Sequence, residues 1–356
     1  MPIKPPRLEF GDIIALVSPA SATPDPKNID RSIAALEKLG FKAKLAPNAR
    51  KRLGFLAGND RERASDIMRM FADRRVKAIV CIRGGYGSAQ LLRLLDYKII
   101  RANPKIFVGY SDITSLHCAF LVKSDLISFH GPMTNSEFIK DDLPKFTLDS
   151  FLRTLMNAEP PGSICAGYTK APEVPRGFGL RQSSAAFPPA VHFQKRQRTA
   201  AVQDAVARAN PIRILRRGKA SGQLIGGNIT LLCTTLATPF QPSFKSKILF
   251  LEDLDEPPYR FDRLLTHLLN AGLLQQVAGV AVGINAGCED PKAKGAKEYR
   301  QTLEDVLRER LLPLKIPVVM NLPFGHVPFN ATLPVGARAT LDANEGDLVI
   351  TSAAVR

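Results

Sequence analysis

Apolar positions in this chain follow two patterns, short continuous runs and longer runs with helical spacing. The continuous runs are rich in Ile and Val and predict buried strands, whereas spacings of three and four predict amphipathic helices. In the first half of the chain the expected order is strand 13–17, helix 28–39, strand 76–82, helix 88–95, strand 105–108 and helix 113–122. Strands that alternate with helices in this way predict a parallel sheet of the α/β class.

The same alternation returns in the second half of the chain, after an interruption. The expected order there is strand 247–251, helix 260–273, strand 277–284, helix 297–312 and strand 317–320. Two further β-rich runs, 339–341 and 347–350, flank Asn344-Glu-Gly346, and this pattern predicts a closing β-hairpin. A length of 356 residues also favours two domains rather than one.

The interruption is a basic segment with little apolar periodicity. The formal net charge of the chain is +16, and residues 171–220 contain ten Lys or Arg against two Asp or Glu. Proline and glycine are frequent there, and the segment lacks a basic helix face with interleaved aromatic residues, so a solvated linker is favoured over a nucleic-acid arm. We therefore expect an N-terminal domain at 1–160, a basic interdomain linker at 161–220 and a C-terminal domain at 221–356.

Composition excludes several other classes of protein. The longest apolar stretches, such as 277–284, fall short of the roughly 20 residues that a membrane-spanning helix needs. The N-terminus has no apolar run of secretory length, so we expect a cytoplasmic protein without a membrane partner. Five cysteines are scattered without a C-x-x-C pair, so neither a disulfide framework nor a zinc site is predicted, and we expect these side chains to be buried.

Candidate chemistry lies directly after the predicted strands, where the ligands of parallel α/β sheets gather. Arg83-Gly-Gly-Tyr-Gly87 follows one strand, and its glycines expose main-chain N–H groups. Its spacing matches no nucleotide fingerprint, so it favours an oxyanion or substrate-backbone contact, with a tight turn as the alternative. Gly109-Tyr-Ser-Asp-Ile-Thr114 follows the next strand and runs into a helix. Ser111 therefore has the placement of a nucleophile elbow, although serine there also serves as a helix N-cap.

A nucleophilic serine needs a base and a group that orients the base. Glu252 and Asp253 follow a predicted strand of the second half, and His326 follows a later strand. An acid and an imidazole on neighbouring strand ends provide such a relay, with Glu256 nearby as a further acid. His130 competes with His326, because it lies near the end of a possible strand of the first half.

Six motifs stand along the chain in a particular order. They are Arg83-Gly-Gly-Tyr-Gly87, Gly109-Tyr-Ser-Asp-Ile-Thr114, His130-Gly-Pro-Met133, Gly226-Gly-Asn228, Leu249-Phe-Leu-Glu-Asp253 with Pro258-Tyr-Arg260, and Phe324-Gly-His326. This ordered set resembles the LD-carboxypeptidase family, the serine peptidases that also include the microcin C self-immunity peptidases. The resemblance covers most of the chain apart from the basic segment, which is longer than the usual connection between the family's domains.

The resemblance implies a fold and a division of roles. The N-terminal domain would be a flavodoxin-like parallel sheet that carries the nucleophile, and the C-terminal domain a swivelling β/α domain that carries the acid and the base. Ser111 would be the nucleophile, His326 the general base and Glu252 the group that orients it. The main-chain amides of Asp112 and Gly85 would form the oxyanion hole. Family members need no metal or organic cofactor and commonly form homodimers, and the sequence itself shows no ligand cluster with metal spacing.

The activity that the resemblance implies is cleavage of an L,D-peptide bond. The typical substrate is a muropeptide tetrapeptide, from which the enzyme releases the terminal D-alanine in cytoplasmic peptidoglycan recycling. An amidase that acts on aminoacyl-nucleotide conjugates, as in the microcin-immunity branch, is one alternative. A non-catalytic, two-lobed small-molecule binding protein is another, and nucleic acid is not an expected partner.

Overall fold

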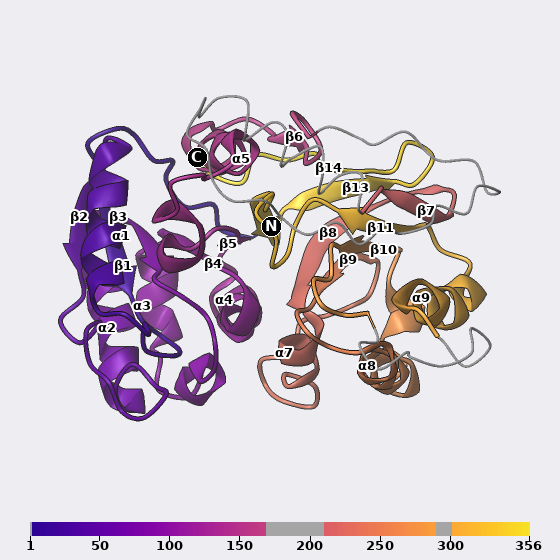
Figure 1. The fold of residues 1–356 in the computed structure, drawn as a ribbon, viewed down its shortest axis with the longest axis horizontal. Coiled ribbons are helices and arrows are strands. Elements are labelled where there is room, and N and C mark those ends of the chain that lie inside the picture. The colour runs from indigo at the N-terminus through magenta and orange to yellow at the C-terminus, as the bar shows by residue number, and fades with distance from the viewer. Residues whose placement is uncertain (1, 169–209, 290–300) are drawn as a thin grey trace, which may run out of the picture.

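Two β-sheets, one in each domain, organise the computed structural model, which describes residues 2–168, 210–289 and 301–356 (Figure 1). The first sheet has the order β12-β5-β4-β3-β1-β2, in which β1 to β5 are parallel. An order of 2-1-3-4-5 is that of a flavodoxin-like doubly wound fold. The strands of this sheet are β1 Ile13–Val17, β2 Lys42–Leu45, β3 Val76–Cys81, β4 Ile106–Gly109, β5 Ser128–His130 and β12 Leu333–Val335.

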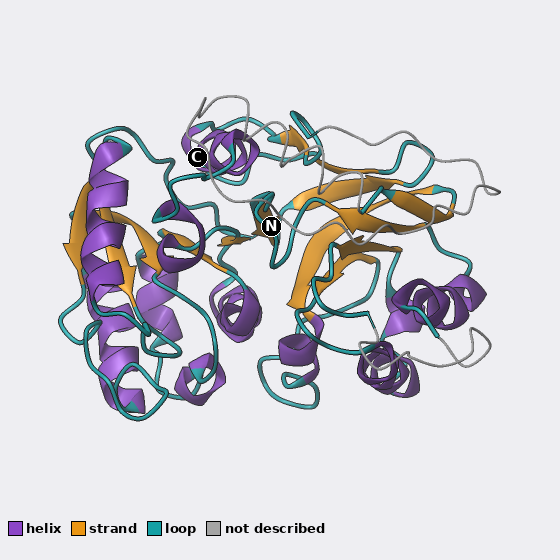
Figure 2. Ribbon diagram, in the orientation of Figure 1, coloured by secondary structure: helices purple, strands orange, loops and turns teal. Residues whose placement is uncertain are grey.

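Helices pack around the first sheet (Figure 2). They are α1 Lys27–Lys38, α2 Asp60–Ala72, α3 Tyr97–Ala102, α4 Thr114–Ser124 and α5 Lys145–Met156, with the 3₁₀ turns η1 Ser88–Leu91 and η2 Ser111–Ile113 and the π-helical turn η3 Thr134–Phe138. In α1 the buried residues Ile29, Ser32 and Leu36 recur at spacings of three and four, as an amphipathic helix requires. α2 begins at a capping box made by Asn59 and Glu62, which fixes where this helix starts.

The second sheet has eight strands in the order β6-β14-β13-β8-β9-β10-β11-β7. Its centre, β8 to β11, is parallel, and antiparallel strands extend it on both sides. The strands are β6 Gly162–Ser163, β7 Arg213–Arg216, β8 Lys219–Asn228, β9 Lys247–Glu252, β10 Gly279–Gly283, β11 Val318–Leu322, β13 Arg338–Asp342 and β14 Asp347–Ile350. The helical elements are α7 Ile229–Cys233, α8 Pro258–Asn270 and α9 Leu303–Leu311, with the 3₁₀ turns η4 Leu274–Gln276 and η6 Leu312–Leu314.

The expected architecture of two α/β domains is confirmed, and so is the closing hairpin, which β13 and β14 form. The five cysteines are buried, as expected, and none of them forms a disulfide in the part of the chain that the structure describes. In the part of the chain that the structure describes, no helix is long and apolar enough to span a membrane. The helix predicted at 88–95 is wrong beyond its first turn. Ser88 is bound through its N–H and its hydroxyl to Asp112, so the segment follows the neighbouring loop instead of continuing as a helix.

The predicted domain boundaries differ from the structure at their edges. Strands β6, β7 and the start of β8 lie within 161–220, the range expected to be a linker, and all three belong to the second sheet. Residues 169–209 of that range lie outside the described residues. β12, from the expected C-terminal domain, pairs with β5 of the first sheet. Without β12, β5 would be an open sheet edge, and covering such an edge is a common reason for a late strand to cross over.

One hydrophobic cluster contains residues of both domains, among them Phe107 of β4 and Phe250 of β9, and a second cluster lies mainly in the C-terminal domain. Helix α4 of the first domain packs against α7 and β8 of the second. Aromatic rings also meet across the contact, since the His130 ring at the end of β5 lies 5.2 Å from the Phe250 ring of β9. These contacts bring the carboxyl ends of both parallel sheets toward a common region.

A glycine near the end of β8 stands where no side chain fits. A Cβ on Gly226 would lie 1.8 Å from the carbonyl oxygen of Phe250, and the backbone there has a φ of 134°. We expect Gly226→Ala to lower the free energy of unfolding by roughly 3 kcal/mol or more, through the clash and the strain together. Urea unfolding measures this loss.

Gly272→Ala is the matched control for that variant. Gly272 also has a positive φ, 68°, but no atom lies within 4 Å of the position its Cβ would take. Only the backbone strain remains, about 1 kcal/mol. Equal losses of stability in the two variants would contradict the steric argument.

Candidate active site

Ser111 lies on a sharp turn between β4 and α4. Gly109 ends the strand, Tyr110 is extended, and Ser111 has a φ of 63°, a conformation rare for a residue with a side chain. Neither η2 nor α4 has a side-chain hydrogen bond at its N-cap, so the alternative that Ser111 caps its helix is wrong. The turn leaves Ser111 half-buried at the end of the central strands. Strain of this kind is a feature of nucleophile elbows.

Asp112 ties the glycine loop to this turn. Its carboxylate accepts hydrogen bonds from the N–H groups of Ser88, at 2.8 Å, and Gly87, at 3.3 Å, and its carbonyl accepts one from the Ser88 hydroxyl. Burial raises the pKa of Asp112, although the hydrogen bonds from Ser88 and Gly87 oppose that shift. The loop therefore lies against Ser111, and a Cβ on Gly84 would be 3.2 Å from the Ser111 Cβ.

Gly85, the second expected oxyanion donor, lies at the exposed tip of the loop. Its φ is 110°, and a Cβ there would lie 2.4 Å from the Ser21 Oγ. The Ser21 hydroxyl accepts a hydrogen bond from the N–H of Tyr86 at 3.1 Å. Glycine is therefore required at position 85 for the loop to approach Ser21 and turn its main chain beside Ser111.

His326 and Glu252 form a hydrogen-bonded pair in the second domain. The His326 Nδ1 lies 2.7 Å from the Glu252 Oε2. A carboxylate only accepts, so Nδ1 carries the proton and Nε2 is left as the acceptor. Gly325 permits this approach, because a Cβ there would lie 3.3 Å from the Glu252 carboxylate and 2.8 Å from the carbonyl of Ile284. Glu252 itself is fully buried at the end of β9.

The surroundings of His326 favour its charged form. Burial alone would lower the pKa of His326, but the charge and hydrogen bond of Glu252, with the charges of Asp253 and Glu137, outweigh burial and raise the pKa above its ordinary value. The imidazole is therefore suited to hold a proton that it receives from a nearby hydroxyl.

The nucleophile turn and the His326–Glu252 pair meet across the domain contact. The Tyr110 ring, next to Ser111, packs edge to face on the His326 ring, with centroids 4.9 Å apart. A little further along, the Thr114 hydroxyl accepts a hydrogen bond from the Asn228 N–H at 3.0 Å. In the described part of the chain no hydrogen bond joins Ser111 to His326 directly.

The competing residues of the sequence analysis occupy other places. Asp253 accepts hydrogen bonds from the Asn228 amide and the Thr230 hydroxyl, both at 2.7 Å, so its carboxylate holds the start of α7. Glu256 lies 3.8 Å from the Arg260 guanidinium, and burial raises its pKa. His130 is fully buried, burial lowers its pKa well below the ordinary value, and no described residue hydrogen-bonds to its ring nitrogens.

Two residues near the site were missed in the sequence. Glu137, buried in η3, accepts a hydrogen bond from the Tyr110 hydroxyl at 2.8 Å. The side chain of Arg63, in α2, is fully buried and donates hydrogen bonds to the carbonyls of Pro19 and Gly87. The bond to Gly87 fixes the end of the glycine loop. Each of these residues is far along the chain from the residues that it contacts. The sequence offered no pattern that indicates Arg63, and for Glu137 the one indication was that its partner Tyr110 precedes Ser111.

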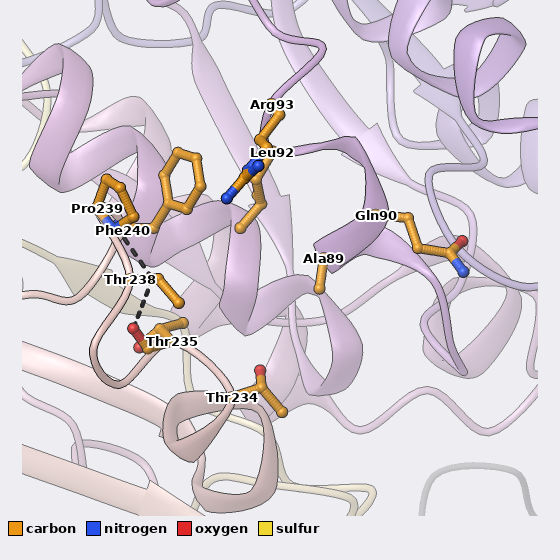
Figure 3. A pocket seen from close by; sticks show the side chains of 9 residues that line it. All are labelled: Ala89, Gln90, Leu92, Arg93, Thr234, Thr235, Thr238, Pro239 and Phe240. Carbon is orange, nitrogen blue, oxygen red and sulfur yellow. Dashed lines mark hydrogen bonds between the residues drawn. The ribbon is translucent and has the colours of Figure 1, made fainter.

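A cavity of about 330 Å³ lies between the segment after the glycine loop and the segment after α7 (Figure 3). Its lining residues are Ala89, Gln90, Leu92, Arg93, Thr234, Thr235, Thr238, Pro239 and Phe240. The three threonine hydroxyls donate to backbone carbonyls of their own segment, so Gln90 and Arg93 supply the other polar side chains of the lining. Among the described residues no group of His, Cys, Asp and Glu side chains has the arrangement of a metal site.

Comparison with known proteins assigns the chain to a class. The model of the LD-carboxypeptidase N-terminal domain matches residues 14–131, and that of the LD-carboxypeptidase C-terminal domain matches residues 221–341. A probable murein peptide carboxypeptidase of Bacillus subtilis is 34% identical to this chain, over 98% of this chain and 94% of that protein. The protein is thus a serine-type hydrolase. It belongs to the LD-carboxypeptidase family.

Solved structures agree with that assignment. The microcin C7 self-immunity protein MccF is similar with a TM-score of 0.79 and 25% identity, over 100% of both chains. A muramoyltetrapeptide carboxypeptidase from Oxalobacter formigenes is similar with a TM-score of 0.72 and 29% identity, over 95% of this chain and 97% of that chain. The similarity spans both domains, so the shared fold includes the contact at which the candidate residues meet.

Proposed function

We propose that this carboxypeptidase cleaves the L,D-peptide bond of a muropeptide tetrapeptide and releases the terminal D-alanine. The observation that carries the proposal is the His326–Glu252 pair, which meets the strained Ser111 turn through the Tyr110 ring. A hydroxyl, an imidazole and a buried carboxylate are the parts of a serine hydrolase relay. In the cell the reaction serves peptidoglycan recycling in the cytoplasm.

The reaction follows from the roles of these groups. Ser111 attacks the carbonyl that precedes the terminal residue, while its hydroxyl proton passes to the His326 Nε2 and Glu252 stabilises the imidazolium. The main-chain amides of Asp112 and Gly85 donate to the oxyanion of the tetrahedral intermediate. His326 then gives its proton to the leaving amine of D-alanine, and an acyl-enzyme remains on Ser111. Water, activated by the same imidazole, hydrolyses that ester and restores the serine.

The substrate class rests on the relatives, and the catalytic relay rests on the geometry. The similar proteins are named murein peptide and muramoyltetrapeptide carboxypeptidases. The Ser111 hydroxyl and the His326 Nε2 still have to come within hydrogen-bond distance, as is common for catalytic groups before substrate binds. A peptide seated between the domains supplies that closure.

The test is mass spectrometry of a purified muropeptide tetrapeptide after incubation with the enzyme. We expect the loss of one alanine from the D-terminated peptide and no loss from an all-L analogue, since the proposed reaction is specific for an L,D-peptide bond. An unchanged D-terminated peptide in the presence of folded protein, or equal cleavage of both peptides, would contradict the proposed substrate.

An amidase of the microcin-immunity type is the second candidate. The similarity to MccF covers the whole chain, and MccF has been crystallised in complex with aspartyl sulfamoyl adenosine. The same relay would cleave an amide between an acidic residue and a nucleotide-like group. Incubation with an aspartyl sulfamoyl adenosine, followed by chromatography, separates the two candidates: release of free aspartate without any muropeptide cleavage supports the amidase.

A further inference from the structure

A buried carboxylate lies behind the nucleophile turn and takes no part in the proposed relay. Glu137, in η3, is only 4% exposed. Its Oε1 accepts a hydrogen bond from the Tyr110 hydroxyl, and its Oε2 accepts one from the Met133 N–H, both at 2.8 Å. Such a carboxylate fixes both donors in place, because leaving a buried donor unpaired costs about 1–3 kcal/mol.

The Tyr110 ring, whose hydroxyl is bound to Glu137, also packs against the His326 imidazole. Tyr110 is buried, and its ring centroid lies 4.9 Å from that of His326 and 5.8 Å from that of His130. Its hydroxyl end is fixed to the N-terminal domain, and its ring faces the imidazole of the C-terminal domain. Tyr110 is also bonded to Ser111 through the chain. Any displacement of Tyr110 therefore changes the position of the Ser111 hydroxyl relative to the imidazole.

We propose that Glu137 is a positioning residue, which acts through Tyr110 to set the distance and orientation between the Ser111 hydroxyl and the His326 imidazole. The inference rests on the proposed function, because it assigns Glu137 a role within that reaction. Positioning of this kind has a large effect on the reaction rate, since a displacement of a reacting group by about 1 Å lowers the rate by about 10²-fold.

The charges around Glu137 make the role measurable. Burial raises the pKa of Glu137 to about 7, although the hydrogen bonds from Tyr110 and Met133 and the charges of Lys140 and His326 oppose it. Helix α1 packs against η3 but contributes none of the charges that act on Glu137. In turn, Glu137 helps to raise the pKa of His326, together with Glu252 and Asp253. A change at Glu137 therefore alters the pH at which His326 becomes neutral and able to act as a base.

The test compares Glu137→Gln and Tyr110→Phe with a matched control, Asp66→Asn. A glutamine keeps one acceptor oxygen for the Met133 N–H, and its neutral amide N–H faces the Tyr110 hydroxyl. The charge-assisted hydrogen bond that Tyr110 donates to the carboxylate is therefore lost. The phenylalanine keeps the ring against His326 but loses the hydroxyl that anchors it. Asp66 is a buried carboxylate whose two oxygens accept one hydrogen bond each, from the backbone and side chain of Asn48. It is not part of the proposed relay.

We expect both site variants to lower kcat by about 10-fold or more while KM changes less than about twofold, because positioning acts on the chemical step. The double variant should be no worse than the single ones, since both remove one linkage. The acid limb of the kcat/KM profile should move to lower pH in Glu137→Gln, because a negative charge near His326 is gone. Asp66→Asn should keep the profile and the rate of the wild type.

Labelling with a fluorophosphonate separates this inference from the proposed substrate. The reagent forms a P–O bond with the Ser111 oxygen, fluoride leaves, and the hydroxyl proton passes to His326, so no muropeptide is needed. Slower labelling of folded Glu137→Gln or Tyr110→Phe supports the inference even where the wild type leaves the tetrapeptide uncleaved. Wild-type labelling rates and an unmoved acid limb in both folded variants would overturn it. The same losses in Asp66→Asn, or no labelling of the wild type at Ser111, would also overturn it.

Discussion

Ser111→Ala is expected to stop alanine release from the muropeptide, with a fall in kcat of about 10⁴-fold or more. In the proposed reaction the Ser111 hydroxyl oxygen forms the bond to the acyl group, so no acyl-enzyme can form without it. Alanine has almost the same size, so the turn with its φ of 63° is preserved at little additional strain. The D-alanine released over time, measured by mass spectrometry at saturating substrate, gives the rate.

Ser115→Ala is the matched control for this variant. Ser115 lies in α4, is fully buried, and its hydroxyl has no hydrogen-bond partner among the described residues. Its removal should leave kcat within about twofold of the wild type, since a buried hydroxyl without a partner contributes little. Folded Ser111→Ala that still releases alanine would contradict the acyl-enzyme. A wild type that binds muropeptide without turnover would instead favour a two-lobed binding protein.

The sequence was sufficient to predict where the chemistry gathers. Continuous apolar runs identified β1, β3 and β4 of the first sheet and β9, β10 and β11 of the second, although not the central strand β8. The carboxyl ends of parallel strands are where ligands bind. Ser111, His326 and the acids after β9 were candidates because they follow such strands, and the family resemblance selected Glu252 among the acids. The structure joins Glu252 and His326 by one hydrogen bond. The elbow at Ser111 was predicted from its position between a strand and a helix, and the positive φ agrees.

Contacts that join distant segments were beyond the reach of sequence patterns. The crossing of β12 into the first sheet depends on β5 having an open edge, which is a property of the assembled sheet. The single turn of η1, in place of a longer helix, depends on Asp112, which lies 24 residues away along the chain. The Tyr110–Glu137 contact likewise joins two elements whose spacing carries no periodic signal.

The two candidate histidines differ in burial, which depends on the tertiary structure and not on the local sequence. His130 ends a strand of the first sheet, so along the chain its placement is of the same kind as that of His326. In the fold its ring is enclosed by aromatic neighbours such as Phe250 and Phe324, whereas His326 keeps a side chain that is 14% exposed and has an acid partner. A base must reach its substrate, so we propose the partly exposed imidazole of His326 as the base.

Glu252→Gln is expected to lower kcat by roughly 10³- to 10⁴-fold and to move the acid limb of the pH profile to lower pH. A glutamine amide can donate to Nδ1, which places the ring proton on Nε2, where it can no longer accept the proton of Ser111. The sign of the pH shift follows from the electrostatics. Burial lowers the pKa of His326 and Glu252 raises it, so without the carboxylate the pKa falls and neutral imidazole persists to lower pH.

Glu256→Gln is the control that separates this role from a general loss of negative charge. Glu256 lies four residues further along the chain, faces Arg260 rather than His326, and is not among the groups that raise the pKa of His326. We expect its turnover to stay within a few-fold of the wild type, with the acid limb unmoved, since a half-exposed ion pair contributes only about 0–1 kcal/mol. Steady-state kinetics between pH 5 and pH 9 measures both quantities. If Glu256→Gln loses activity while Glu252→Gln keeps it, the residue that orients His326 is Glu256, and the 2.7 Å contact with Glu252 is structural only.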